Sequence, residues 1–329
     1  MPNRIKDPVN YRLDGTEPTG KVEFENFLQK MTDVPESEPL NSIPINEVGI
    51  TNQQVYVTID DLSDPKTKTP VLCDVSLGVD LSDHRGIHMS RCEEALFEIS
   101  RGTYTDLDEF ALALAERLRE KQSSSLGIVK VSGIHLHHRQ TKKTARSSHD
   151  KVILLSEAIA SENGHIQQTG VTAFNMTACP CTRTYTKLSV IPRLKELGFD
   201  TEQINKILGT VLTGTHTQRG TITVMIDKKH PEISAREILK VLDQTTHLVN
   251  ELLKRPDEHD LVIRALQKPQ FTEDVVRDVA KGLFEKFGNL TPLNTRIIVE
   301  SILNDSIHIH DVRSKITTTL GRIGDALKS

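Results

Sequence analysis

The sequence predicts an α+β protein in which antiparallel sheets carry helices on one face. Segments rich in β-branched residues with period-two alternation flank a pair of helical segments, and this order occurs twice along the chain. The simplest organisation is therefore two copies of a ββααββ unit. Because a lone sheet of this kind leaves two open edges, the pattern also favours oligomerisation through strand pairing.

In the first half, the predicted strands cover residues 53–60, 71–81, 127–138 and 150–158. Ser90 and Glu93 have the spacing of a capping box, which predicts the start of a short helix. A longer helix is expected after Thr105, because apolar residues then recur with helical spacing. That apolar stripe consists of Leu107, Phe110, Ala111, Leu114 and Leu118.

In the second half, the predicted strands cover residues 170–178, 220–227 and 295–303. Ser234 and Glu237 form another capping-box pattern, predicting a helix that runs to about Lys254. Further helices are expected around 201–212, inside a long excursion between two strands, over 272–287, and in the tail from about Asp311. The order of the first half is thereby repeated.

Composition limits the classes of function. Residues 1–45 are polar and proline-bearing and are expected to form a flexible tail, followed by units at 46–160 and 161–329. A net charge of −4 indicates neither a nucleic-acid nor a membrane partner. No apolar run is long enough to span a bilayer, and the first residues lack the apolar stretch of a signal peptide. With only four cysteines, a reducing cytoplasm is the expected location.

Two of the four cysteines, Cys179 and Cys181, stand one proline apart in the segment TACPCTRTY. A structural zinc site needs four ligands, and Cys73 and Cys92 do not have the spacing of a second pair. A redox pair is normally C-x-x-C, which is absent. Two interpretations stay open from these residues alone: one thiolate bound to a catalytic metal, or two buried small apolar side chains.

Three further segments concentrate polar side chains. Residues 80–94 contain His84, Arg85, His88 and Arg91 beside a predicted helix start, where an anion would be favoured; an ordinary turn and cap is the alternative. Residues 214–223 place His216, Gln218 and Arg219 just before a strand. Residues 304–311 place His308 and His310 two apart, with Asp305 and Asp311 nearby, a pattern suited to metal binding or proton transfer.

Other candidates have a strong structural alternative. His135 and His137 share one face of a predicted strand, but no carboxylate or thiol is close in sequence, so a solvated face or a subunit contact is expected there. Residues 254–260 are expected to end one helix, and 269–278 to begin another. Glu258, Glu273 and Asp274 are candidate carboxylates, although acids at a helix start are favoured by the helix dipole alone.

Six motifs together resemble the prokaryotic type IB GTP cyclohydrolases. They are GIHMSR, TACPC, THTQRG, LLKRPDE, FTEDVVRD and DSIHIHD, and they occur in family order between about residues 70 and 311. The resemblance implies a bimodular tunnelling fold with two ββααββ units per chain, a homotetramer with active sites near subunit interfaces, and GTP as the substrate. It also implies a divalent metal cofactor, namely Fe²⁺, Mn²⁺ or Zn²⁺.

The resemblance also assigns roles to individual residues. Cys179 and His216 match the thiol and imidazole of the metal site, and Glu258 matches a carboxylate associated with that metal. Asp305 stands where many members carry a glutamate, so its role as a ligand is open. His308 and His310 match histidines of metal binding or catalysis, and Glu273 matches the glutamate that anchors the purine. On this interpretation Cys179 is a single metal-bound catalytic thiolate, and Cys181 either packs or lies just behind the metal ligands.

The implied chemistry is the attack of water on C8 of guanine, followed by ring opening and loss of formate. A divalent metal lowers the pKa of water for this attack, and a histidine can move protons to the ring nitrogens. Cationic and imidazole groups such as Arg85, His88 and Arg219 would hold the triphosphate. Glu273 would accept two hydrogen bonds from the guanine edge.

The expected product is 7,8-dihydroneopterin triphosphate, the first intermediate of folate and pterin biosynthesis. However, 36 residues separate Cys179 from His216, and this long excursion is similar to that of archaeal-type members. Those enzymes make the 2′,3′-cyclic phosphate in the methanopterin pathway, so that product is the alternative. A non-catalytic purine- or pterin-binding paralogue is the third possibility, and the presence of the metal-site residues argues against it.

Overall fold

The computed structural model describes residues 20–28 and 34–328. Within this part of the chain, nine strands form one continuous sheet in the order β3-β1-β2-β4-β5-β6-β7-β8-β9. Neighbouring strands are antiparallel except for the short β3, which pairs parallel with β1. The mixed α+β class with a large sheet and helices is therefore confirmed.

The strands are β1 (Ile45–Asp60), β2 (Lys68–Leu81), β3 (Thr103–Tyr104), β4 (Leu126–Gln140), β5 (Ser147–Ser161), β6 (Gly164–Ala178), β7 (Thr217–Asp227), β8 (Arg296–Asn304) and β9 (Asp311–Thr319). The helices are α1 (Lys21–Leu28), α2 (Met89–Ser100), α3 (Leu107–Gln122), α4 (Pro180–Ser189), α5 (Ile191–Glu196), α6 (Thr201–Thr210), α7 (Ala235–Thr245), α8 (Arg255–Gln267), α9 (Thr272–Phe287) and α10 (Leu320–Lys328).

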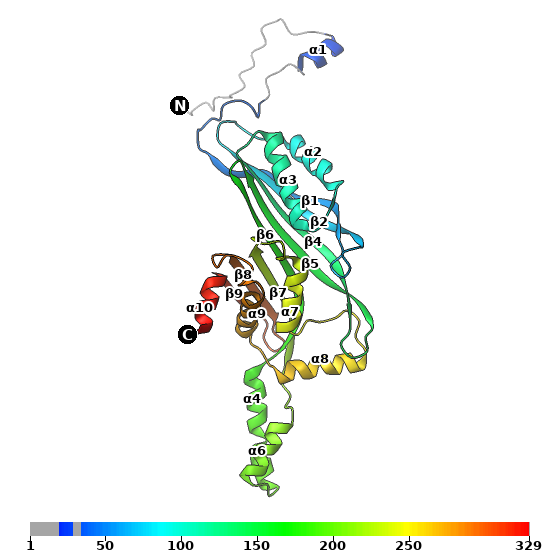
Figure 1. Ribbon diagram of the computed structural model, residues 1–329, viewed down its shortest axis with the longest axis vertical. Coiled ribbons are helices and arrows are strands. Elements are labelled where there is room, and N and C mark those ends of the chain that lie inside the picture. Colours follow the sequence, from blue (N-terminus) through cyan, green and yellow to red (C-terminus); the bar gives the residue numbers. More distant parts are fainter. Residues whose placement is uncertain (1–19, 29–33, 329) are drawn as a thin grey trace, which may run out of the picture.

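Helices cover one face of this sheet, and the core lies between the two layers. In Figure 1, α2 and α3 pack over the upper strands, whereas α7 and α9 pack over the lower ones. The stripe predicted after Thr105 is the buried face of α3, where Phe110 and Leu114 are fully buried. Side chains point alternately to the two faces, so odd-numbered positions of β1, β2, β4 and β6 enter this core.

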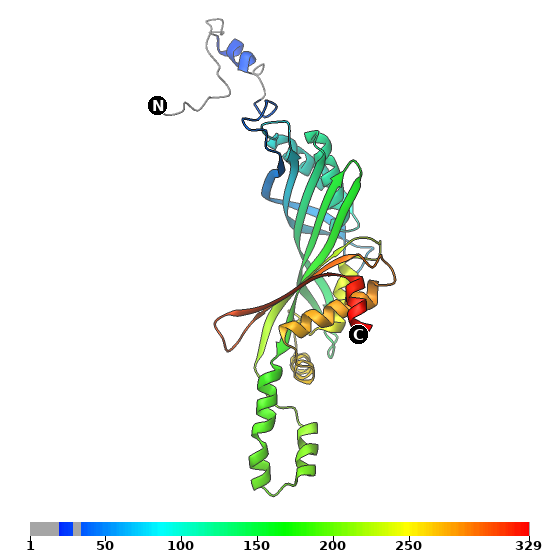
Figure 2. The same ribbon diagram turned by 90° about the vertical axis from the view of Figure 1, so that its left-hand side faces the viewer.

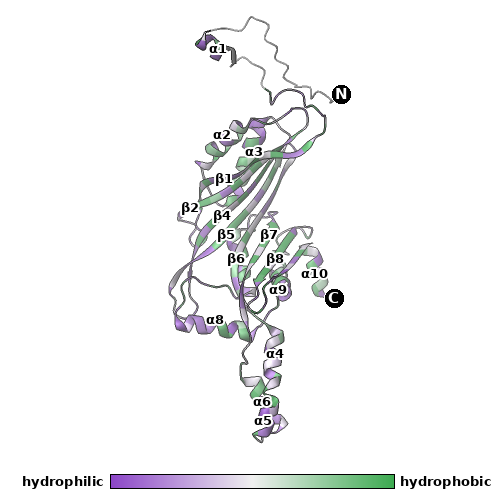
Figure 3. Ribbon diagram, turned by 180° about the vertical axis from the view of Figure 1, so that it is seen from behind, coloured by the Kyte–Doolittle hydropathy of each residue, from purple (hydrophilic) through white to green (hydrophobic). Residues whose placement is uncertain are grey.

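The opposite face of the sheet lacks such a cover within the described part of the chain. In the view from behind, the strands face the viewer and alternate between apolar and polar residues (Figure 3). Several large apolar side chains at even-numbered positions are between 40% and 66% exposed. They are Tyr56, Leu72, Ile134, Leu136 and Ile166. Apolar residues spread over one sheet face in this way are typical of a contact surface.

A buried ion pair ties the first half of the chain to the second. The ammonium of Lys228, just after β7, lies 2.5 Å from Asp106 and 2.8 Å from Asp108 at the start of α3. Burial, together with the charge of Asp106, raises the pKa of Asp108 to about 7, although Lys228 opposes that rise. The start of α3 is therefore fixed against the strands of the second half.

Most predicted elements are confirmed, but three assignments are wrong. Residues 255–267 form a helix of their own: Pro256 fits the first turn of a helix, where its missing N–H is not needed, and α7 already ends at Thr245. The tail from Asp311 begins as strand β9, and its helix starts only at Leu320. Ser90 does not cap α2, which begins after His88 without a side-chain cap.

The polar N-terminal segment is only partly within the described residues. Residues 1–19 and 29–33 lie outside them, whereas Lys21–Leu28 form a short helix that the sequence did not predict. Pro35 and Ser37 contact the segment between β2 and α2, since the backbone amides of Arg85 and Gly86 donate to the carbonyl oxygens of Ser37 and Pro35. In the described part, no helix is long and apolar enough to cross a membrane.

Candidate functional site

Cys179 and His216 lie side by side where β6 ends and β7 begins. The last strand pair is Ala178 with Thr217, and the next residues continue the same register. The backbone amide of Cys179 donates to the carbonyl oxygen of His216 over 3.1 Å. The hydroxyl of Thr215 donates to the carbonyl oxygen of Cys179 over 2.9 Å. Two residues with 36 others between them are thus held at one point, and α4–α6 project from it (Figure 2).

The two cysteines of this segment have different surroundings. Cys179 precedes α4, and its sulfur accepts a hydrogen bond from the backbone amide of Thr182 over 3.4 Å. A helix N-terminus favours negative charge, which suits a thiolate. Cys181 lies in the first turn of α4 and is exposed. The expectation of a packed Cys181 is therefore wrong within the described residues, because Pro180 begins a helix that leaves this sulfur at the surface.

The turn between β8 and β9 brings a third group to this place. Nδ1 of His216 lies 3.2 Å from the hydroxyl of Ser306, the second residue of the turn. The Asp305 carboxylate accepts hydrogen bonds from the backbone amides of Ile307 (2.8 Å) and His308 (3.2 Å). These bonds, with the nearby His216 and His308, hold the pKa of Asp305 below its usual range. Asp305 is thus a fixed carboxylate beside His216.

His308 and His310 occupy the same turn. Their rings are stacked with centroids 5.1 Å apart and planes 14° apart, and both side chains are exposed. Figure 2 shows the β8–β9 hairpin, coloured orange to red, projecting from the body. The sequence placed both residues at a strand end, but β8 stops at Asn304 because Asp305 turns the chain. The two imidazole rings nevertheless lie next to each other, as the spacing predicted.

The two carboxylates of the segment RPDE have separate roles. Glu258 is exposed in the first turn of α8. Its neighbour Asp257 is only 4% exposed and accepts hydrogen bonds from the backbone amides of Lys143 and Thr144, both over 3.0 Å. The hydroxyl of Thr144 and the amide of Lys254 donate to the same carboxylate. Asp257, which the sequence did not single out, therefore clamps the turn between β4 and β5 onto α8.

Glu273 is exposed in the first turn of α9, and the residue before it anchors that helix. The Thr272 side chain is buried, and its hydroxyl donates to the carbonyl oxygen of Ser301 on β8 over 3.3 Å. In the same turn, Asp274 accepts a hydrogen bond from the backbone amide of Phe271, which closes the helix start. The carboxylate of Glu273 is left at the surface, where a ligand can reach it.

The proposed phosphate-binding residues do not gather at one place in the chain. Arg85 and His88 precede α2, at the opposite end of the molecule from α4 (Figure 1). There the backbone of His88 exchanges hydrogen bonds with the side chain of Gln122. Arg219 lies on β7 opposite Met176 and lines a separate hollow of about 340 Å³. The chain thus separates Arg85 and His88 from Cys179 and His216.

Metal donors are only partly assembled in one chain. Among residues 20–28 and 34–328, no group of three or more His, Cys, Asp or Glu side chains is arranged to hold a metal ion. Cys179 and His216 are neighbours and Asp305 is close to His216, whereas no contact in the described residues joins Glu258 or Glu273 to them. The donor types fit a first-row divalent metal, but the described side chains are not gathered around one point.

Comparison with known proteins decides the family. The model of the family "Type I GTP cyclohydrolase folE2" matches residues 31–314. "GTP cyclohydrolase MptA" of Methanococcus aeolicus is 31% identical over 311 residues, covering 90% of this chain and 99% of the relative. The chain belongs to the type I GTP cyclohydrolase folE2 family. The expectation of an enzyme of the GTP cyclohydrolase class is confirmed.

Other members of this GTP cyclohydrolase family are similar over the same extent. The MptA protein of Methanosphaera stadtmanae is 27% identical over 316 residues, covering 92% of this chain and 99% of the relative. Among solved structures, uricase from Arthrobacter globiformis aligns with 83% of this chain and 93% of its own at 8% identity. The TM-score of 0.45 is too low to establish a shared fold.

In this cyclohydrolase, His135 and His137 are not on a solvated face. Both lie on the helix-covered side of β4, where His135 is 1% exposed. Their odd-numbered positions point toward the helices, which corrects the expectation of a solvated face or subunit contact. His137 lines a cleft of about 630 Å³ between β4, β5 and α7. The alternation of β4 could have revealed this orientation, because Val129 and Val131 share the same face.

We predict that Asp257→Asn lowers the urea midpoint of the metal-free protein at pH 7. Burial alone would raise the pKa of Asp257, but hydrogen bonds from Thr144, Lys143 and Lys254 outweigh it and hold the pKa well below its usual range. The stabilisation is therefore present above the unfolded pKa of about 3.9 and is lost as pH falls through the lower folded value. Urea unfolding from pH 7 to pH 3 should show the difference from wild type shrinking below about pH 4.

Glu258→Gln is the matched control for this measurement, since Glu258 is an exposed acid in the same helical turn. It should leave the urea midpoint almost unchanged. Equal midpoints for wild type and Asp257→Asn at pH 7 would show that the clamp contributes nothing to stability.

Proposed function

We propose that this enzyme opens the imidazole ring of GTP at C8, releases formate and gives 7,8-dihydroneopterin 2′,3′-cyclic phosphate. The observation that carries the choice of product is the arm of three helices, α4–α6, which leaves the chain between Cys179 and His216. An excursion of this length is similar to that of archaeal-type enzymes, and the relatives reported above are archaeal. This proposal replaces the sequence-based expectation of the triphosphate.

Cys179 and His216 would hold a divalent metal, which we propose to be Fe²⁺, Mn²⁺ or Zn²⁺. Asp305 or Glu258 would supply the carboxylate, and His308 an additional imidazole. When bound, such a metal supplies the Lewis acidity that makes water an effective nucleophile at neutral pH. The adjacent backbones of Cys179 and His216 support this role, because two donors held in register lose little freedom on binding.

The remaining side chains would act on the substrate itself. Glu273 would accept the N1–H and 2-amino hydrogens of guanine, which adenine does not offer in that pattern. His310, stacked on His308 and exposed at the hairpin tip, would protonate and deprotonate the ring nitrogens as C8 leaves as formate, and His308 would share this role where it is not bound to the metal. Arg219 would contact the phosphates of the same substrate molecule.

Formation of the cyclic phosphate needs no further reactant. After the ribose carbons have been built into the pterin, a side-chain hydroxyl lies next to the carbon that bears the triphosphate. Its oxygen attacks the nearest phosphorus, that P–O bond forms, the bond to diphosphate breaks, and the hydroxyl proton is lost to solvent. Over the whole reaction, GTP and one water give the cyclic phosphate, formate and diphosphate.

Assembly would complete the site. We propose a type IB enzyme of two ββααββ tunnelling-fold units, residues 46–160 and 161–329, that forms a homotetramer. In such an assembly Arg85 and His88 of one subunit would approach Cys179 of another, which fits their separation within the chain (Figure 1). The uncovered sheet face with its exposed apolar side chains supports a large contact between subunits.

We predict that the reaction releases one diphosphate for each formate. The protein would be reconstituted anaerobically with Mn²⁺ or Fe²⁺ and incubated with GTP, and the product mass would be measured beside formate and diphosphate. Chelation should stop formate release, and added metal should restore it. Formate release with an intact triphosphate product and no diphosphate would refute the proposed product but keep the ring-opening activity.

The two cysteines provide a second test. We predict that Cys179→Ser loses turnover and most tightly bound metal, because serine supplies neither the charge nor the soft donor of a thiolate at neutral pH. Cys181→Ser is the matched control, since this sulfur is exposed in the same segment and should leave metal content near wild type. Metal per chain would be measured for both variants. Loss of metal in Cys181→Ser alone would reverse the assignment.

A third prediction concerns recognition of the base. Glu273→Gln removes the charge that pairs with the two guanine donors, and should weaken GTP binding by about 1.5–3 kcal/mol. Metal content should not change. Asp274→Asn is the control in the same helical turn, because that carboxylate is already engaged with the amide of Phe271. Unchanged GTP affinity in Glu273→Gln would show that this residue is only a helix-start acid.

A further inference from the structure

A cleft of about 630 Å³ lies between the β4–β5 hairpin and α7, and we name it the hairpin cleft. It exists because β5 and β6 separate: their last pair is Ile153 with Thr172. Beyond it, β5 continues along β4, whereas β6 pairs with the segment 247–249. The amide of Met176 donates to the carbonyl oxygen of His247 over 2.9 Å. The separated strands leave room that no side chain of the described residues fills.

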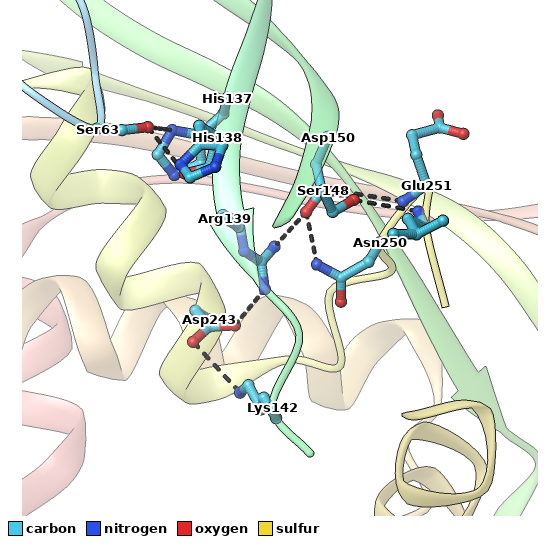
Figure 4. A network of polar contacts seen from close by, with 11 residues as sticks. Ser63, His137, His138, Arg139, Lys142, Ser148, Asp150, Asp243, Asn250 and Glu251 are labelled. Atoms are coloured by element: carbon cyan, nitrogen blue, oxygen red, sulfur yellow. Dashed lines mark hydrogen bonds and ion pairs between the residues drawn. The ribbon is translucent and has the colours of Figure 1, made fainter. Parts of the chain in front are cut away.

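A polar network holds the walls of the hairpin cleft in place (Figure 4). Asp150 is only 4% exposed, and it accepts hydrogen bonds from the side chain of Asn250 (2.7 Å) and the backbone amide of Glu251 (2.9 Å). Arg139 lies between two carboxylates, 3.5 Å from Asp150 and 3.0 Å from Asp243. β4, β5, α7 and the loop after residue 248 are thereby joined. The cleft is preformed.

Two cations of the cleft are left without an acidic partner. Arg236 donates to the backbone oxygen of Asp61 over 2.8 Å, but its Nε is buried and has no hydrogen-bond partner in the described residues. Lys151 lies 6.0 Å from the ring centre of Phe174 and forms no ion pair within the described part of the chain. A buried guanidinium nitrogen without a hydrogen-bond partner lowers the stability of the folded protein. The presence of Arg236 in the cleft therefore favours an anionic ligand that accepts a hydrogen bond from it.

The rest of the lining is mostly apolar. It includes Leu62, Val152, Ala173, Leu239, Leu248 and Val249. Burial, with Arg139 nearby, lowers the pKa of His137 to about 4, so this side chain is neutral at pH 7 and adds no charge. The four basic residues Arg139, Lys151, Arg236 and Lys240 outnumber the acidic Asp150 and Asp243. The volume lies within the range of about 300–1,000 Å³ usual for small-molecule sites.

We propose that the hairpin cleft is a second binding site, which takes a flat aromatic ring carrying one phosphate group, as in a nucleoside monophosphate. The ring would pack on the apolar lining and Phe174, and the phosphate would pair with Arg236 and Lys151. None of the residues proposed for ring opening lines this cleft, but Lys151 and Phe174 also line the hollow that contains Arg219. Arg236 lines the cleft and not that hollow, so the Arg236→Gln variant distinguishes the two sites.

The test is binding of adenosine 5′-monophosphate to the full-length protein by isothermal titration calorimetry at low salt. Adenine lacks the donor pattern that Glu273 would select, so this probe discriminates against the catalytic site. We expect one molecule per chain in wild type. Lys151→Gln should weaken binding at least tenfold, and Arg236→Gln should do the same. Lys151 is exposed, so its replacement does not endanger folding.

Lys130→Gln is the matched control, because Lys130 is an exposed lysine on the neighbouring strand β4, outside the cleft. It should bind the probe like wild type, and so should Glu273→Gln. Absence of binding in wild type, or equal affinity in Lys151→Gln and wild type, would overturn the proposal. Loss of binding in Glu273→Gln would also overturn it, since the probe would then occupy the catalytic site.

Discussion

The register between β6 and β7 is the constraint on which the rest of the structure depends. Pairing of Ala178 with Thr217 places Cys179 beside His216 and starts α4 at that point. A slip by one residue would exchange the two faces of the strand, sending Val171 and Ala173 out of the core. Exposing that apolar surface would cost free energy, so burial of Val171 and Ala173 keeps the β6–β7 register and, with it, the relative positions of Cys179 and His216. The placement of these two candidate metal donors thus follows from core packing in the same strands.

Two buried carboxylates extend this control to the β4–β5 hairpin. Asp257 holds the turn of the hairpin on α8, and Asp150 joins its second strand to the loop that pairs with β6. Both carboxylates are almost completely buried, and each accepts several hydrogen bonds, so neither is left as an unpaired charge. The hairpin therefore does not move independently of α8. Glu258 follows Asp257 directly, so its position depends on the same clamp.

Much of the fold could be predicted from the sequence, because core-facing strands and helices carry strong periodicity. The α3 stripe and the strands β4, β5 and β8 are examples. Strand β9 was missed because none of its side chains is buried, so its sequence shows no apolar alternation. Residues 254–260 were expected to end a helix, but Pro256 lies in the first turn of α8, a position where a proline fits the start of a helix.

The site could be predicted only in part, for a related physical reason. Local motifs indicate residue types, and strand pairing brings Cys179 to His216 across 36 residues. No local signal encodes the distance between Arg85 and Cys179, which depends on the length and twist of the whole sheet.

That sheet carries its helices on one side and exposes residues such as Tyr56 and Leu136 on the other. A second subunit that covered this face would bury apolar surface at about 25 cal/mol per Å². An association of subunits that covers the exposed sheet face would therefore also be able to bring Arg85 of one subunit close to the candidate metal donors Cys179 and His216 of another.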